Sequence, residues 1–127
     1  MGHLVLDRIA GIIATRRGSW EAYANALSDR AELELMSLRP GTEFNYAYFP
    51  VVFDTEARML RVQAALLAQR IHGRRYFHPS LDTLPYVAAQ ECPVSRSVAS
   101  RILCLPLYAY MEEGLVDRIA AIVKAAL

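Results

Sequence analysis

The sequence predicts a single α+β domain of two layers, in which a small mixed sheet is covered by helices on one face. Length is the first reason, because 127 residues make one ordinary domain and leave little room for another. Composition is the second: 54% of the residues are hydrophobic and 21% are charged, which supplies a core and excludes a disordered chain. The third is the spacing of the hydrophobic residues, which follows the helical period in some segments and the strand period in others.

The first pattern predicts a long helix from Leu4 to Leu27. Gly11 and Gly18 within it each cost about 1 kcal/mol relative to alanine, so the helix needs tertiary packing to hold it. Its apolar residues recur near the period of 3.6 that is typical of an amphipathic helix, at Leu6, Ile9, Ile13, Trp20, Tyr23 and Leu27.

Two strands are predicted to follow. Polar and apolar residues alternate over 32–35, as in a half-exposed strand, and Arg39-Pro40-Gly41 then forms a turn. Residues 45–53 are rich in aromatic and β-branched side chains, which favour a second strand. Pro50 lacks an amide hydrogen for the ladder, so this strand should lie at an edge or bulge there.

A second helix is predicted next, because Asp54-Thr55-Glu56 supplies a capping oxygen and negative charge for a first turn. Gly73 is expected to terminate this helix. The segment from His78 to Cys92 has no periodic pattern and contains two prolines, which predicts a long loop of the kind that is often functional. The buried stripe of the helix is expected to be Leu60, Ala64, Leu67 and Ile71.

The remaining elements are a short helix, a strand and a final helix. Pro93 suits the first turn of a helix over 94–101, and the apolar run over 102–107 predicts a buried strand. Glu112 and Glu113 then open the last helix. Its inward face is expected to carry Leu115, Ile119, Ile122 and Ala126.

Charge and hydropathy exclude several classes of function. The net charge of +1 argues against binding to nucleic acid or a membrane surface through bulk charge. No apolar run approaches the roughly 20 residues that span a bilayer, and the first residues lack the features of a secretion signal. We therefore expect a soluble, cytoplasmic protein in which Cys92 and Cys104 are reduced.

The usual sequence patterns of catalysis are absent. No Gly-x-Gly-x-x-Gly or Walker pattern is present, which excludes the nucleotide-binding folds that use them. Cys104 lies in an apolar strand, where burial makes a thiol unreactive. No metal site is expected, because no Cys-x-x-Cys or His-x-x-x-His spacing occurs among the candidate ligands His3, His72, His78, Cys92 and Cys104.

Residues 74–78, Arg-Arg-Tyr-Phe-His, form the most concentrated polar and aromatic cluster. Two guanidinium groups, two aromatic rings and an imidazole suit a phosphorylated or nucleotide-linked ligand. The alternative is a solvated arginine pair, with Tyr76 and Phe77 in the core and His78 in a turn. Asn45, Tyr46 and Tyr48 leave the same choice between a ligand contact and packing.

Taken together, the motifs resemble the C-terminal domain of the DegT/DnrJ/StrS sugar aminotransferases. The resemblance covers essentially the whole chain, with 1–28 as the helix that joins two domains and 29–127 as the small α+β domain. It rests on Leu6-Asp7-Arg8-Ile9, Arg16-Arg17 and Tyr23 in the first helix, then on 74–81, Leu84-Pro85-Tyr86, Cys92-Pro93-Val94-Ser95, 101–108 and Val116-Asp117-Arg118-Ile119.

This resemblance implies a homodimeric enzyme of aminotransferase fold type I that uses pyridoxal phosphate to move an amino group from glutamate to a nucleotide-linked ketosugar. The large domain that holds the cofactor and its Schiff-base lysine in such enzymes has no counterpart here. Lys124, the one lysine of the chain, lies near the end of the last helix, where it suits the helix dipole. We therefore expect no catalytic residue, no cofactor bound by this chain alone, and no transamination without a partner.

The part of the site that the resemblance carries over is the 76–78 loop, where Tyr76 and His78 are expected to hydrogen-bond the sugar. Three functions stay open: a small domain that needs a large-domain partner, a self-associating interaction module without catalysis, and an independent enzyme. The apolar side of the first helix, around Ile9, Ile13 and Trp20, should be buried by some partner, and a homodimer is the simplest one.

Overall fold

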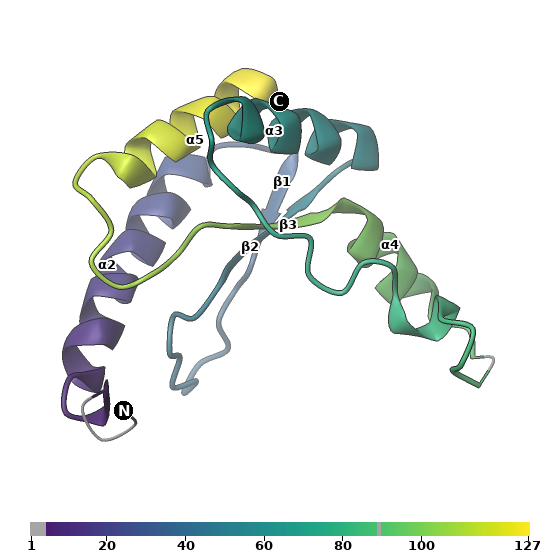
Figure 1. The fold of residues 1–127 in the computed structure, drawn as a ribbon, viewed down its shortest axis with the longest axis horizontal. Helices are drawn as coiled ribbons and strands as arrows, with labels where there is room; N and C mark the ends of the chain where they lie inside the picture. The colour runs from purple at the N-terminus through teal and green to yellow at the C-terminus, as the bar shows by residue number, and fades with distance from the viewer. Residues whose placement is uncertain (1–4, 89) are drawn as a thin grey trace.

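A computed structural model describes residues 5–88 and 90–127 of the chain. Apart from a 3-10 turn inside the long loop, its elements follow the predicted order (Figure 1). The predicted helix start at Leu4 lies outside the described residues. The elements are α2 (Ile9–Leu27), β1 (Leu33–Leu35), β2 (Phe49–Phe53), α3 (Glu56–Ala68), η1 (Leu81–Thr83), α4 (Pro93–Arg101), β3 (Ile102–Leu105) and α5 (Leu115–Ala126).

The sheet has the strand order β1-β2-β3 and is antiparallel throughout, so the prediction of a mixed sheet was wrong. Its register pairs Leu33 with Phe53, and Val52 with Ile102. The reason is the path between β2 and β3. The chain leaves β2 at Phe53 and enters β3 at Ile102, beside that same end of β2. An excursion that starts and finishes at one end of a sheet must return antiparallel.

Pro50 lies in the central strand rather than in an edge strand. It stands opposite Cys104, whose amide and carbonyl groups both bond to Arg74 on the other side of β3. The Pro50–Cys104 pair is therefore not a hydrogen-bonded pair, and an amide at position 50 would point toward β1. Since β1 ends at Leu35, opposite Val51, no ladder bond is lost there. β2 is therefore the central strand of the sheet, but at Pro50 it has no paired neighbour on the β1 side.

The core lies between one face of the sheet and the helices α2, α3 and α5, as the two-layer prediction requires. Alternate residues of β2 are buried there, and α5 packs between α2 and α3 (Figure 1). Thr55 caps α3 by accepting a hydrogen bond from the Arg58 amide, as expected for a helix entry at 54–56. The fully buried large side chains are Tyr23, Leu27, Phe49, Val51, Phe53, Met59, Val62, Leu66, Leu103, Ile119 and Val123.

The predicted buried stripe of α3 was wrong. The core side chains of this helix are Met59, Val62 and Leu66, whereas Leu60 and Leu67 are 44% and 55% exposed. Two apolar stripes, offset by about one residue, run along α3, and periodicity does not say which of them meets the sheet. The unpredicted stripe is the one that β2 and α5 cover. Ala64 is exposed and Ile71 is only partly buried against the core.

The last helix has the predicted face only in part, since Val116, Ala120 and Val123 are buried beside Ile119, and it starts later than predicted. Ile119 is buried, and Leu115, Ile122 and Ala126 pack against the core as partly buried side chains. The helix begins at Leu115, after Gly114, whose φ of +76° is a conformation that favours glycine. Glu112 and Glu113 lie in the preceding turn.

The two ends of α2 have different surroundings. Its second half enters the core through Tyr23 and Leu27. Trp20 is covered by the chain itself, because Phe44, Tyr46 and Phe49 pack edge-on against its ring. The first half extends away from the sheet, with Ile9 exposed and Ile13 half-buried (Figure 1). None of the helices in the described part of the chain is long and apolar enough to cross a bilayer.

The orientation of α3 predicts opposite results for two neighbouring leucines. Leu66→Ala should lower the free energy of unfolding by about 2 to 5 kcal/mol, because it leaves a cavity in the core. Leu67→Ala should change it by less than about 0.5 kcal/mol, because that side chain is exposed. Urea denaturation of both variants measures the difference. A larger loss in Leu67→Ala would mean that the sequence-predicted stripe faces the core after all.

Candidate ligand-binding site

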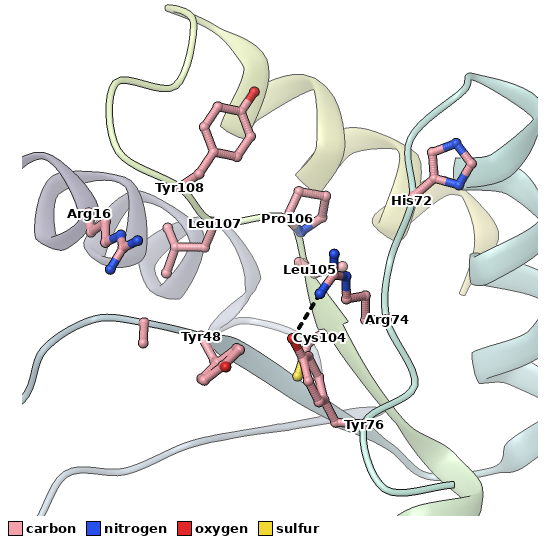
Figure 2. A pocket seen from close by; sticks show the side chains of 11 residues that line it. Arg16, Tyr48, His72, Arg74, Tyr76, Cys104, Leu105, Pro106, Leu107 and Tyr108 are labelled. Carbon is pink, nitrogen blue, oxygen red and sulfur yellow. Dashed lines mark hydrogen bonds between the residues drawn. The ribbon is translucent and has the colours of Figure 1, made fainter. Parts of the chain in front are cut away.

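A cavity with a volume of about 570 Å³ lies beside the C-terminal end of β3. That volume falls in the range of roughly 300 to 1,000 Å³ that is typical of small-molecule sites. Its walls come from α2, from the residues before β2, from the segment after α3 and from the residues that follow β3 (Figure 2). The lining residues are Arg16, Ala47, Tyr48, His72, Arg74, Tyr76, Cys104, Leu105, Pro106, Leu107 and Tyr108.

Arg74 is placed at the cavity by a backbone bridge to the free edge of β3. Its amide donates to the Cys104 carbonyl oxygen at 3.0 Å, and its carbonyl accepts from the Cys104 amide at 2.9 Å. Successive side chains of an extended segment point to opposite sides. Accordingly, His72, Arg74 and Tyr76 line the cavity and Arg75 does not. Arg74 Nη1 also donates to the Tyr76 hydroxyl at 3.3 Å (Figure 2).

Gly73 allows this segment to approach β3 closely. A Cβ at this position would lie 3.0 Å from Leu103 Cδ1, so a larger residue would require the Leu103 side chain or the segment to shift by a few tenths of an ångström. Gly73 was predicted to end α3, and this prediction was wrong. The helix ends at Ala68, and Arg70 takes the left-handed conformation with a φ of +59°. The prediction failed because a glycine near a helix end serves close packing as readily as termination.

Arg75 stabilises the fold and does not face the cavity. Its Nη2 donates to Glu56 Oε1 and to the Ser100 carbonyl oxygen, both at 2.8 Å, and its side chain is only 18% exposed. It thereby ties the start of α3 to the end of α4. The two neighbouring arginines of the sequence cluster thus have different surroundings, and only Arg74 faces the cavity.

The two predicted sugar-binding residues lie in different surroundings. Tyr76 lines the cavity, whereas His78 is exposed, does not line it, and has its Nδ1 3.2 Å from Arg75 Nη2. Phe77 between them is 73% exposed, which contradicts the reading that buries it in the core.

The sequence did not assign Arg16 or Tyr108 to a site, and it left Tyr48 as either a ligand contact or a packing residue. Tyr48 faces the cavity, while its neighbour Tyr46 packs on Trp20. Arg16 and Tyr108 come from segments that showed no site signal beyond the family resemblance. Arg16 and Arg17 are adjacent in the sequence, and only the orientation of α2 shows which of them reaches the cavity.

The cavity presents positive charge and hydroxyl groups. Within residues 5–88 and 90–127, no Asp or Glu lines it. The hydroxyl of Tyr76 raises the pKa of Arg74 above its usual range, and the same hydroxyl raises the pKa of Tyr48. Burial raises the pKa of the Cys104 thiol from 9.0 to about 11, which keeps it neutral as predicted. The lining therefore suits an anionic ligand and offers no nucleophile.

The long loop before α4 is held by Asp82, which the sequence analysis did not single out. Its carboxylate accepts from Ser80 Oγ at 2.5 Å, from Arg96 Nε at 2.6 Å and from the Cys92 amide at 3.3 Å. These donors hold the pKa of Asp82 below its ordinary value, Ser80 contributing most. Pro93 lies in the first turn of α4, as predicted. The carboxylate thus fastens the loop to the start of α4.

The remaining candidate groups lie outside the cavity. Lys124 Nζ is 3.5 Å from Asp29 Oδ1. Cys92 and Cys104 are free thiols, as expected. His3, one of the candidate metal ligands, lies outside the described residues, and among those that are described no three His, Cys, Asp or Glu side chains gather as a metal site.

The fold and these motifs are those of an aminotransferase domain. The profile of the DegT/DnrJ/EryC1/StrS aminotransferase family matches residues 1–124, and the chain belongs to this family. It is 31% identical over 126 residues to dTDP-4-amino-4,6-dideoxy-D-glucose transaminase of Escherichia coli, a match that covers 93% of this chain and 34% of the relative. The transaminase of the same description from Shigella dysenteriae is 26% identical, over 97% of this chain and 35% of its own.

Solved structures agree with this assignment. The aminotransferase TlmJ from Streptoalloteichus hindustanus superposes with a TM-score of 0.90 at 21% identity, over 98% of this chain and 34% of that one. A DegT DnrJ EryC1 StrS aminotransferase from Brucella abortus gives a TM-score of 0.80 at 25% identity, over 94% and 32%. The chain thus spans about a third of the length of the relatives that it matches.

Pyridoxal phosphate is the cofactor of this family, and the residues of this chain do not fit its covalent attachment. The one lysine is ion-paired with Asp29 and does not line the cavity. A Schiff-base lysine instead needs burial or a positive neighbour to lower its pKa. Lys124 is therefore not a candidate for the Schiff-base lysine.

Asp82→Asn should loosen the loop and lower the melting temperature at pH 7. Because the folded-state pKa of Asp82 is below the ordinary 3.8, its stabilising effect is present above that pH and is lost as pH falls through the folded pKa. The difference in melting temperature should therefore shrink as the pH falls below 3.8. Glu91→Gln, on the same loop and exposed, is the control. A difference that does not change with pH would contradict a charge-dependent role.

Proposed function

We propose that this chain is the C-terminal part of a pyridoxal-phosphate-dependent aminotransferase that acts on nucleotide-linked ketosugars. The observation that carries the proposal is the family match over 1–124, combined with relatives that are described as transaminases of a dTDP-linked amino sugar. A solved relative, DesI, is described with its TDP-sugar product, and it superposes with a TM-score of 0.80 at 25% identity. A cavity lined by arginines and tyrosines suits such a polar, anionic substrate.

In this proposal the chain does not catalyse transamination alone. The cofactor, when bound, would supply the electron sink for amino transfer, and a larger domain would hold it, because this chain covers only about a third of its relatives. The chain's own part is to close the substrate side of the site. A cleft made by two surfaces binds more tightly than one exposed wall.

Exposed apolar side chains support a partner on two faces. The residues before α2 present Leu6, which is 63% exposed, and the segment before α4 presents Phe77 and Tyr86, which are 73% and 82% exposed. Large apolar side chains that are exposed in this way suit contact with a partner. The proposed partners are the large domain and a second copy of the assembled enzyme. The alternative, a self-associating module without catalysis, would use the same faces but would ignore nucleotide sugars.

For substrate binding we propose hydrogen bonds from Tyr76 and His78 to the sugar. The Tyr76 hydroxyl faces the cavity beside Arg74. The ring of His78 is exposed two residues further along the same loop, where a ligand could reach it. A large domain placed over this loop would bring the two groups to the same ligand.

Borohydride reduction in the presence of pyridoxal phosphate tests whether the cofactor is held by this chain or by a large-domain partner. The chain alone should gain no covalent mass, because Lys124 is paired with Asp29. With a large-domain chain from the same genome, the adduct should form on that partner, and glutamate-dependent transamination should appear. Intact-mass spectrometry and an absorbance spectrum measure both, with Lys124→Arg as the control. A specific adduct on Lys124 would contradict the proposal, and so would a complex that shows no transamination.

In the assembled enzyme, Tyr76→Phe and His78→Gln should each raise KM for the nucleotide sugar by about two- to tenfold, the usual effect of losing one hydrogen bond. Steady-state kinetics at saturating glutamate measure this effect. Tyr110→Phe, a change of the same kind at an exposed residue that does not line the cavity, should leave KM unchanged. An unchanged KM in both site variants would remove these residues from the sugar site.

A further inference from the structure

A second apolar stripe runs along the outer face of α3, opposite the stripe that enters the core. Its members Leu60, Ala64, Leu67 and Ile71 follow one another at intervals of four, three and four residues. Leu60 and Leu67 are 44% and 55% exposed, and Ala64 is exposed as well. This spacing is the one by which a helix packs along another helix in a coiled coil. The outer stripe therefore has the form of a helix-pairing surface.

A hollow of about 390 Å³ lies beside the outer stripe. Its walls are α3 on one side and residues 71–73, which lead back toward β3, on the other (Figure 1). In the described part of the chain, no Asp, Glu, Lys or Arg lines it. Ala64 lies between the two leucines, and its small side chain lets another helix approach closely. The surface thus combines projecting leucines with a space that can receive a leucine of the partner.

Polar side chains next to the outer stripe are directed toward α5. Arg61, which follows Leu60, donates to the Leu127 carbonyl oxygen at 2.8 Å. Gln69 accepts a hydrogen bond from Arg118 of α5 at 3.2 Å. These two contacts fasten α3 to α5 and leave the leucines uncovered.

The two ends of α3 expose opposite charges. Asp54 and Glu56 lie at its start and are 41% and 46% exposed, whereas the arginines that pair with them are only 24% and 18% exposed. The carboxylates are therefore the more exposed members of these pairs. Arg70 lies just after the other end of the helix and is exposed. Two copies of such a helix attract each other when they run antiparallel, since acidic and basic ends then meet.

We propose that the outer stripe of α3 is a contact between two copies of this chain, with their α3 helices antiparallel across a two-fold axis near Ala64. Leu60 lies four residues before Ala64 and Leu67 three residues after it. The axis therefore places Leu60 of one copy against Leu67 of the other. It also brings Arg70 of each copy to the acidic start of α3 in the other. A parallel pairing would place like charges together.

The contact is small and separate from the faces proposed for the large domain. Those faces are the residues before α2 and the segment before α4. A helix of 13 residues is about 20 Å long, so one pair of helices buries less than the roughly 800 Å² per partner of a standard interface. We therefore expect a dimer that dissociates on dilution. At the low concentrations of a denaturation experiment Leu67 is exposed, as predicted above.

Sedimentation equilibrium of the chain over a range of concentrations tests the proposal. The average mass should rise from 14.2 kDa toward twice that value as the concentration approaches about 0.5 mM. Leu67→Glu should keep the chain monomeric, because it brings an uncompensated charge into an apolar contact. Leu6→Glu, the same change at an exposed leucine before α2, is the matched control and should leave the association unchanged. Circular dichroism reports whether each variant keeps the fold.

Cross-linking tests the position of the two-fold axis. Ala64→Cys should form a disulfide between two copies under mild oxidation, because a residue at such an axis lies opposite itself. Ala14→Cys, at an exposed alanine of α2, is the control and should remain monomeric. Both changes are made together with Cys92→Ser, since Cys92 is partly exposed. Non-reducing electrophoresis and intact-mass spectrometry measure the product.

A chain that stays monomeric at about 0.5 mM would overturn the contact, and so would a dimer that Leu67→Glu does not affect. Loss of the dimer in Leu6→Glu alone, or cross-linking of Ala14→Cys alone, would move the interface to α2. Protection of Ala64→Cys by an added large-domain chain, without cross-linking, would assign the outer stripe to that domain instead. Failure of transamination in the assembled enzyme would count against the proposed function and leave this contact standing.

Discussion

The backbone bridge between Arg74 and Cys104 is the contact on which the site depends. It attaches a single extended residue to the free edge of β3, so that β3 has a hydrogen-bonding partner on each side. An unpaired strand edge is a liability in a small sheet, and this bridge covers part of it. The same bridge sets the alternation that turns Arg74 and Tyr76 toward the cavity and Arg75 away from it.

Gly73 and Pro50 both follow from this arrangement. Gly73 lets the segment pass within van der Waals contact of Leu103. Since Cys104 directs its backbone groups to Arg74, its pairing with Pro50 requires no amide hydrogen from the proline. A residue that would break an ordinary central strand is therefore accommodated at the strand position next to the cavity.

The charged side chains fall into two groups, those that hold the fold together and those that line the cavity. Arg75 and Asp82 belong to the framework, since one joins α3 to α4 and the other joins the long loop to α4. Arg16 and Arg74 instead line the cavity, which no described Asp or Glu lines, so their side chains suit an anionic ligand.

Sequence by itself determined the order of elements, the two-layer α+β class and the family, because these depend on local periodicity, capping residues and ordered motifs. Thr55, Pro93 and the apolar run of β3 acted as expected, since a cap, a first-turn proline and a buried strand are local properties. Tertiary structure alone decided which stripe of α3 is buried, because both stripes are apolar and only β2 and α5 distinguish them. It also decided that Arg16 rather than Arg17, and Arg74 rather than Arg75, meet at one cavity, because adjacent side chains point in directions that only the packing of their elements determines.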